Sequence, residues 1–304
     1  MQHVCVLISK PGSGAITDAV VAAVGGHSGV TGPGRWLCPN EAWETGISLA
    51  SDAAEDFKPA RDSLADEIRD LMGGAPVDVA IVPAGHRRKR LLIADMDSTM
   101  IEQECIDELA GALGLKERVA AITERAMRGE IAFEPAVRER VGLLKGLTRD
   151  EIGQIADARI SLMPGACTLV RTMRASGAYT ALVSGGFTIF TSRIARIIGF
   201  DMNRANELLF EDDRLTGAVA EPILGQDAKR QTLLELVESH GLDMAETLAV
   251  GDGANDLAMI RLAGTGVAYR AKPAVAAAAD VRIDHGDLTA LLYLQGYTSA
   301  EFTG

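Results

Sequence analysis

The chain has 304 residues, 47% of them hydrophobic, so it is long enough for two domains with apolar cores. Its formal net charge of −12 at pH 7 argues against a nucleic-acid partner, which would need a dense basic surface. Its four cysteines, Cys5, Cys38, Cys105 and Cys167, show no zinc or disulfide pattern. Because no apolar run reaches membrane-spanning length and no secretory signal opens the chain, we expect a cytoplasmic protein with no membrane partner.

Residues 1–85 predict a small unit in which strands and helices alternate. Strands are expected over 4–9, 35–38 and 77–82 with a further one near 42–49, and helices over 15–24 and 59–72. The order β-α-β-(β)-α-β resembles ferredoxin-like modules such as the ACT-type amino-acid-binding domains. We therefore expect an ACT-like domain with a regulatory or packing role.

From residue 86 to residue 304 the pattern changes to α/β alternation. Short apolar strands are expected over 91–94, 178–183 and 247–250, and continuous apolarity suits central strands of a parallel sheet buried on both faces. The stretch of about 104–163 is mostly helical and too long for a plain crossover. The fold class predicted is therefore a doubly wound parallel α/β sheet with an inserted helical cap.

The first of these strands runs directly into Asp95-Met96-Asp97-Ser98-Thr99, a DxDxT pattern. Beside a divalent cation, one of two such carboxylates can attack phosphorus while the other transfers a proton. A DxD alone is often a surface turn or a helix cap, and that alternative stays open for the isolated motif. Its position after a buried strand favours the chemical interpretation.

The second strand ends in Ser184-Gly185-Gly186, where backbone N–H groups can approach an anion closely. A helix that begins near Thr188 would direct its positive end to the same anion. The alternative is a plain strand-to-helix turn. Since ligands bind at the carboxyl ends of parallel strands, we expect this motif to converge on one site with the DxDxT pattern.

The third strand is followed by Gly251-Asp252-Gly253-Ala254-Asn255-Asp256, which offers two carboxylates and an amide within five residues. Such hard oxygen ligands suit magnesium better than a transition metal. Lys229, at the expected start of a helix, could hold a phosphoryl oxygen or offset the acidic cluster, although most lysines are simply exposed.

Taken together and in this order, the four motifs resemble the haloacid dehalogenase superfamily of phosphatases over about residues 91–292. With the cap segment 133–145, the chain is also similar to the phosphoserine phosphatase family within it. The resemblance implies that Asp95 is the nucleophile and Asp97 the general acid/base. It further implies that Mg²⁺ is held by the Asp95 carboxylate, the Asp97 backbone carbonyl and the Asp252 carboxylate.

The same resemblance implies a binding site for O-phosphoserine. The residues that it assigns to the phosphoryl group and to the support of the site are Ser184, Gly185, Lys229, Asn255, Thr99 and Asp256. Glu104 and Arg140 would bind the substrate's ammonium and carboxylate groups, and Phe133 would shield the site. Taken singly, Glu104 and Arg140 could equally be solvated helix charges.

The expected activity is hydrolysis of O-phosphoserine, the last step of serine synthesis, by an enzyme that could form a homodimer. Alternatives are another small-molecule phosphatase, a phosphotransferase that uses homoserine as acceptor, and a non-enzymatic phospho-aspartate receiver or amino-acid sensor. Asp97 argues against a receiver, because an acid/base residue would hasten hydrolysis of the phospho-aspartate.

Overall fold

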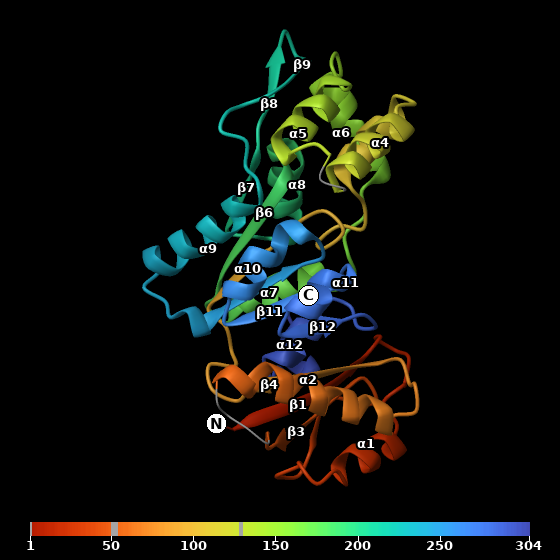
Figure 1. Cartoon of the computed structure of the whole chain (residues 1–304), viewed down its shortest axis with the longest axis vertical. Coiled ribbons are helices and arrows are strands. Elements are labelled where there is room, and N and C mark those ends of the chain that lie inside the picture. The colour runs from red at the N-terminus through yellow and green to blue at the C-terminus, as the bar shows by residue number, and fades with distance from the viewer. Residues whose placement is uncertain (1, 50–53, 128–129) are drawn as a thin grey trace.

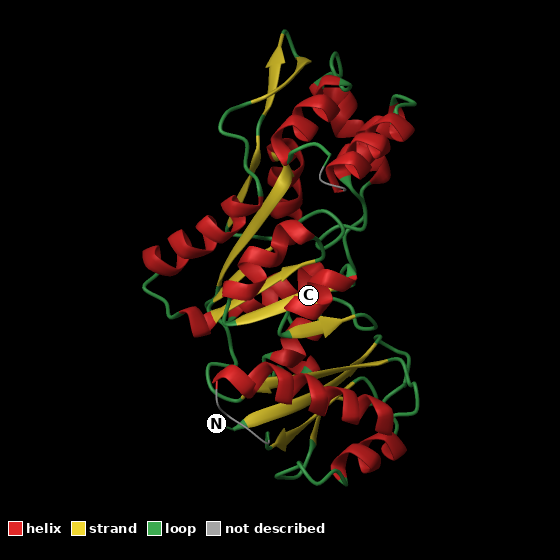
Figure 2. Ribbon diagram, in the orientation of Figure 1, coloured by secondary structure: helices red, strands yellow, loops and turns green. Residues whose placement is uncertain are grey.

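The computed structural model describes residues 2–49, 54–127 and 130–304 (Figure 1). Within these residues the strands form a four-stranded sheet near the N-terminus, a central six-stranded sheet and a two-stranded hairpin. The three sheets follow one another along the long axis of the molecule, with the helices around them (Figure 2). In the part of the chain described here, no helix is both long and apolar enough to cross a membrane.

The N-terminal unit contains a four-stranded antiparallel sheet in the order β2-β3-β1-β4. Its elements are β1 (His3–Ser9), α1 (Asp18–Gly25), β2 (Arg35–Cys38), β3 (Ala42–Ile47), α2 (Ala54–Leu71) and β4 (Val77–Pro83). The element order is the one expected. Helix α2 begins at Ala54, before Pro59 instead of at it, so Pro59 lies inside the helix, where a proline removes one backbone donor. The ACT-like relationship and the boundary at residue 85 stay predictions.

The central sheet is parallel, in the order β12-β11-β10-β5-β6-β7, as a doubly wound α/β fold requires. Its strands are β5 (Leu91–Ala94), β6 (Tyr179–Phe187), β7 (Met202–Asn206), β10 (Thr247–Gly251), β11 (Thr265–Tyr269) and β12 (Val281–Ile283). The flanking helices are α7 (Ala166–Ala175), α8 (Thr188–Ile198), α9 (Gln226–Ser239), α10 (Leu257–Leu262), α11 (Pro273–Ala278) and α12 (Ala290–Leu294), with the 3₁₀ turns η1 (Met244–Glu246), η2 (Ala254–Asp256) and η3 (Ser299–Glu301).

Strand β5 shows why this sheet is apolar throughout. Leu92 and Ala94 belong to one hydrophobic core, whereas Leu91 and Ile93 belong to another, because alternate side chains of a strand point to opposite faces. All four are fully buried. The sheet is therefore covered on both faces, and its polar groups gather at strand ends.

A helical cap is inserted between β5 and β6. Its helices are α3 (Cys105–Ala112), α4 (Lys116–Met127), α5 (Phe133–Gly142) and α6 (Arg149–Arg159). The sequence places the cap at about 104–163, of which residues 128 and 129 lie outside the described residues. The cap lies beyond the end of the central sheet farthest from the N-terminal unit (Figure 1).

The hairpin of β8 (Leu208–Glu211) and β9 (Arg214–Val219) extends the cap and was not expected from the sequence. The Gly146 N–H donates to the Leu215 carbonyl and the Leu215 N–H to the Leu147 carbonyl, both at 2.8 Å. The hairpin turn places Asp212 and Asp213 at φ of 46° and 62°. Such turns usually carry Asn-Gly, so two aspartates gave no hairpin signal.

Polar contacts fix the N-terminal sheet to the central domain. The Asp78 carboxylate accepts the backbone N–H groups of three consecutive residues, 284–286, at 2.8 to 3.2 Å. Arg87 forms an ion pair with Glu44 and donates to the Leu294 carbonyl at 2.8 Å. The two units are therefore joined by buried, directional bonds as well as by apolar contact.

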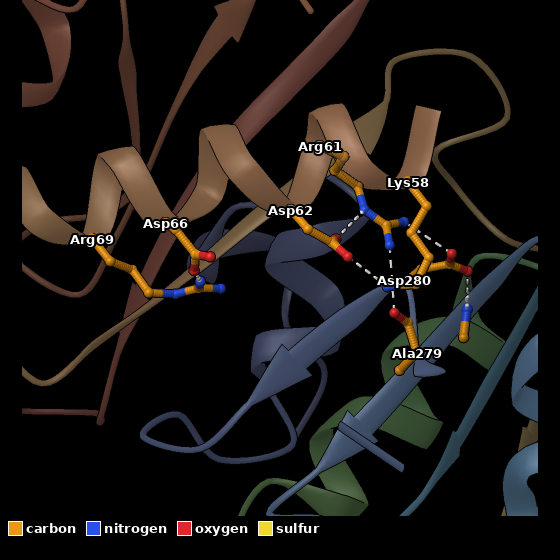
Figure 3. A network of polar contacts seen from close by, with 8 residues as sticks. Lys58, Arg61, Asp62, Asp66, Arg69, Ala279 and Asp280 are labelled. Carbon is orange, nitrogen blue, oxygen red and sulfur yellow. Dashed lines mark hydrogen bonds and ion pairs between the residues drawn. The ribbon is translucent and has the colours of Figure 1, made fainter. Parts of the chain in front are cut away.

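Helix α2 makes a second polar junction, shown in Figure 3. The Arg61 guanidinium is 3% exposed and donates to Asp280 Oδ1 at 2.9 Å and to the Ala279 carbonyl at 3.4 Å. The Asp62 carboxylate forms ion pairs with Lys58 and Arg61 of the same helix. Arg61 thus ties α2 to the residues that directly follow α11.

Candidate active site

Strands β10, β5 and β6 are neighbours in the central sheet, so the three polar motifs that follow them meet at one edge. Asp95 directly follows β5 and is only 3% exposed. Its backbone N–H donates to the Val250 carbonyl of β10 at 3.0 Å, which ties the first motif to the third. The sheet therefore holds the Asp95 carboxylate in a fixed, nearly dry position.

An acidic cluster with one buried ammonium forms the centre of this edge. Asp95, Asp252 and Asp256 each offer a carboxylate oxygen, and these oxygens lie within 4.8 Å of one another. Lys229 Nζ lies 2.5 Å from Asp95 Oδ1 and 2.5 Å from Asp256 Oδ1. Three carboxylates thus face one ammonium group.

The electrostatics reflect this excess of negative charge. Burial raises the pKa of Asp95 well above its ordinary value, with Asp256 adding to the shift and Lys229 opposing it. Burial and Asp256 raise the pKa of Asp252 to about 6. Burial disfavours the charged form of Lys229, but Asp256 and Asp95 raise its pKa above the ordinary value. A hard divalent cation would offset the remaining charge, and the oxygen donors fit one.

The loop after β10 leaves little freedom to Asp256. Its Oδ1 accepts a hydrogen bond from Lys229 Nζ. Its Oδ2 accepts hydrogen bonds from the backbone N–H groups of Asp252 at 3.2 Å and Gly253 at 3.0 Å. A Cβ on Gly253 would collide with Asn255 Oδ1, so the Asn255 side chain would have to move. Asn255 therefore lies against its own loop, beside the acidic cluster.

Asp97 joins the first motif to the second. Its Oδ1 accepts the Cys105 N–H at 2.8 Å, and its Oδ2 accepts the Ser184 hydroxyl at 3.1 Å. The Gly186 N–H in turn donates to Ser184 Oγ at 2.8 Å. Burial raises the pKa of Asp97, although the Cys105 and Ser184 hydrogen bonds act against the shift. A raised pKa is what a carboxyl needs to carry a proton near neutral pH.

Glu104 lies between Asp97 and the cap, where it precedes the first residue of α3. Ser98, held at φ 57°, donates its hydroxyl to Glu104 Oε1 at 2.8 Å. Burial of the carboxylate raises the pKa of Glu104 to about 7, with Asp97 and Asp252 adding to the shift. Glu104 is therefore ready to receive a cation at the side of the site that faces the cap.

Arg140 and Phe133 both come from helix α5. Burial lowers the pKa of Arg140, while Asp107 and Glu104 act in the opposite direction. Its guanidinium donates to Thr123 Oγ1 and to the Ala136 carbonyl, both at 3.2 Å, so it is bonded within the cap. The Phe133 ring is 40% exposed and lies over the loop of the second motif.

Not every expected site residue gains a partner. Thr99 is fully buried, and its hydroxyl has no hydrogen-bond partner among the described residues. The roles assigned to all these side chains stay predictions.

The sequence did not indicate four further residues that also reach the site, namely Ser98, Cys105, Gly186 and Asn206. Three of them act through backbone geometry or N–H groups, which leave no signature in a sequence.

Residues 92–261, more than half of the chain, match the family model described as haloacid dehalogenase-like hydrolase. The chain belongs to this family. The match contains all three strand-end motifs and Lys229, and it confirms the parallel α/β fold class expected from the sequence. Within this family, curated phosphoserine phosphatases match the chain, so the finer resemblance is confirmed as well.

A phosphoserine phosphatase from Streptomyces coelicolor is 40% identical over 259 residues, which are 84% of this chain and 62% of that one. The enzyme from Haemophilus influenzae is 45% identical over 204 residues, 67% of this chain and 65% of that one. The chain thus spans less than two thirds of these two relatives. A phosphoserine phosphatase from Albidiferax ferrireducens is 47% identical over 67% of this chain and 89% of its own.

Solved structures agree with this family membership. A haloacid dehalogenase family hydrolase from Salmonella enterica superposes with a TM-score of 0.82 at 30% identity and covers 96% of this chain and 98% of its own. A substrate-bound phosphoserine phosphatase complex superposes with a TM-score of 0.63 at 37% identity, over 68% of this chain and 98% of its own. The first likeness therefore includes the N-terminal unit.

Proposed function

We propose that this haloacid dehalogenase-like hydrolase converts O-phospho-L-serine and water to L-serine and phosphate through a phosphorylated Asp95, the last step of serine synthesis. The observation that carries the proposal is the pairing of a buried phosphoryl-transfer centre with two opposite charges, Glu104 and Arg140, beside it. The relatives named phosphoserine phosphatase support the same substrate. A cytoplasmic location and a homodimer stay predictions.

We infer that the bound cation is Mg²⁺, held by the carboxylates of Asp95 and Asp252 and by the backbone carbonyl of Asp97. It would supply positive charge that offsets the phosphate dianion and brings it within reach of a carboxylate. The donor set, the burial of Asp95 and the raised pKa values of Asp95 and Asp252 support this assignment.

In the proposed reaction the Asp95 carboxylate attacks phosphorus, and the bond from phosphorus to the serine oxygen breaks. Asp97 gives its proton to that oxygen, and the resulting carboxylate then takes a proton from the water that hydrolyses the aspartyl phosphate. Lys229, the Ser184 hydroxyl and the Gly185 N–H would bind the phosphoryl oxygens. The raised pKa of Asp97 supports its role as the acid.

Recognition of serine would come from the cap. Glu104 would accept the substrate's ammonium, and Arg140 would exchange its bonds to Thr123 and Ala136 for the substrate's carboxylate. Phe133 would cover the phosphoryl group and keep water out. A substrate without the amino-acid end would gain nothing from these two charges.

The test uses two arginines of the same helix. Arg138 is exposed and pairs with Glu134 and Glu221 on the outer surface, so Arg138→Ala is a matched control. Arg140→Ala should lower kcat/KM for O-phosphoserine by about 10- to 100-fold, the worth of a hydrogen bond to a charged group, and leave p-nitrophenyl phosphate nearly unchanged. Equal losses on both substrates would refute the assignment of Arg140. Release of serine only when homoserine is present, with phosphohomoserine formed in place of phosphate, would favour the phosphotransferase.

A further inference from the structure

Asn206 is the last residue of β7 and lies outside the three strand-end motifs. Its side chain is 2% exposed and makes three hydrogen bonds to backbone groups. Nδ2 donates to the Gly185 carbonyl at 2.8 Å and to the Leu224 carbonyl at 3.3 Å, and Oδ1 accepts the Leu224 N–H at 2.7 Å.

These bonds fix the orientation of the amide. The backbone N–H of Leu224 requires an acceptor, so the oxygen must face it, and the two carbonyls then receive the two N–H bonds of the amide. Both donors of Asn206 are used. An apolar or smaller residue here would leave carbonyls in a nearly dry place without donors.

The two backbones that Asn206 joins lead to different parts of the proposed phosphoryl site. Gly185 lies near the end of β6 and belongs to the second motif. Leu224 precedes Gly225, the N-cap of α9, and Lys229 lies about one helical turn further along. The position of the Lys229 ammonium therefore depends on where α9 begins.

The same two segments also support the cap. A Cβ on Gly185 would lie 3.6 Å from the Phe133 ring, and a Cβ on Gly225 would lie 3.5 Å from it. Phe133 thus rests on both glycines at once. A change in the separation of these two segments would disturb the packing of Phe133 as well as the phosphoryl contacts.

We propose that Asn206 is a positioning residue that holds the Gly185 end of β6 and the start of α9 at a fixed separation, so that the Gly185 N–H and Lys229 reach one phosphoryl group together. The inference rests on the proposed function only for the assignment of a phosphoryl group to these donors. It does not depend on serine as the leaving group.

The chain offers a matched control on the same strand. Asn203 also uses its side-chain amide, whose Oδ1 accepts the hydroxyls of Thr191 at 2.8 Å and Ser192 at 3.3 Å, but these lie on α8 and belong to neither segment that Asn206 joins. Asn206→Ala and Asn203→Ala therefore remove the same atoms from one strand. Thermal unfolding of both variants reports any general loss of stability.

The probes are inorganic phosphate and Mg²⁺, measured by calorimetry, with hydrolysis of p-nitrophenyl phosphate and O-phosphoserine as kinetic readouts. Asn206→Ala should weaken phosphate binding in the presence of Mg²⁺ roughly tenfold and lower kcat/KM on both substrates by the same factor. Mg²⁺ affinity should stay within about twofold of wild type, since the carboxylates are untouched. Asn203→Ala should stay within about twofold in every binding and kinetic readout.

Several outcomes would overturn the inference. They are wild-type phosphate affinity in Asn206→Ala, equal losses in Asn206→Ala and Asn203→Ala, or a loss confined to O-phosphoserine. If Asn206→Ala does not fold, Asn206→Ser decides the question, because its hydroxyl can serve one of the two carbonyls and should give an intermediate loss. Failure of both to fold would make Asn206 a residue of the fold alone. A wild type that hydrolyses p-nitrophenyl phosphate but not O-phosphoserine would refute the proposed function and leave this test intact.

Discussion

Replacing Lys229 by methionine should remove the ammonium that partly offsets the three carboxylates at the centre of the site. Lys229 is 2% exposed, and its Nζ lies 2.5 Å from Asp95 Oδ1 and 2.5 Å from Asp256 Oδ1. Methionine fills much the same volume as the lysine stem, so the variant removes the charge and leaves the packing largely intact. Asp95, Asp256 and Asp252 would then face one another without a counter-charge.

The size of the effect follows from the separations. Two unit charges 4.8 Å apart, the outer limit of this cluster, repel by about 3 kcal/mol at an effective dielectric constant of 20. Loss of one partner from a buried charge pair typically costs about 3–5 kcal/mol. We therefore expect metal-free Lys229→Met to lose about 3–5 kcal/mol of unfolding free energy near neutral pH. Activity should fall at least about 100-fold, because a donor to the phosphoryl oxygens is gone.

Urea unfolding with and without Mg²⁺ measures the stability, and phosphate release measures the activity. Lys272→Met is the control, because Lys272 is exposed and still lies near enough to Asp252 to influence its pKa. It should change stability by less than about 0.5 kcal/mol. Added Mg²⁺ should restore part of the stability of Lys229→Met, since it offsets the same carboxylates. A metal-free Lys229→Met as stable as wild type would refute this account of the charge cluster.

Two further expectations concern the carboxylates. Asp97→Asn keeps the shape of the side chain but cannot carry a proton, so hydrolysis should fall at least about 100-fold while calorimetry finds Mg²⁺ still bound; rapid turnover would contradict the role of Asp97. The pKa of Asp252 is raised to about 6, so the metal-free protein loses stability as pH rises through that value. Mg²⁺ should therefore raise Tm more at about pH 8 than at about pH 5, and equal shifts in Tm would count against a metal held by Asp252.

The strand-end motifs could be predicted because each follows a continuous run of buried apolar residues. Leu91–Ala94 lies at the centre of the sheet, so the polar residues directly after it lie at the carboxyl edge of the sheet. The parallel arrangement then brings Asp95 and Asp252 together, because β5 and β10 are neighbours in the sheet. Lys229 lies on α9, which the strand pattern does not place. Local pattern and topology agreed here, which is why the fold class and the acidic centre were predictable.

The remaining features depend on backbone geometry or on contacts between distant segments. The β8–β9 hairpin was missed because its turn has Asp212 and Asp213 at positive φ in place of the usual Asn-Gly. Asn206 was missed because its partners, Gly185 and Leu224, are 21 and 18 residues away in the chain. Nothing in the local sequence distinguishes such an asparagine from an ordinary polar residue at a strand end.

The most direct test of the central claim is the release of phosphate by the wild-type chain from O-phosphoserine, O-phosphothreonine, phosphohomoserine and p-nitrophenyl phosphate, with and without Mg²⁺. We expect hydrolysis that requires Mg²⁺ and a kcat/KM for O-phosphoserine at least about tenfold above that for p-nitrophenyl phosphate, which lacks the amino-acid end that Glu104 and Arg140 would bind. Equal kcat/KM values across the panel, or hydrolysis that persists after the metal is chelated, would contradict the account.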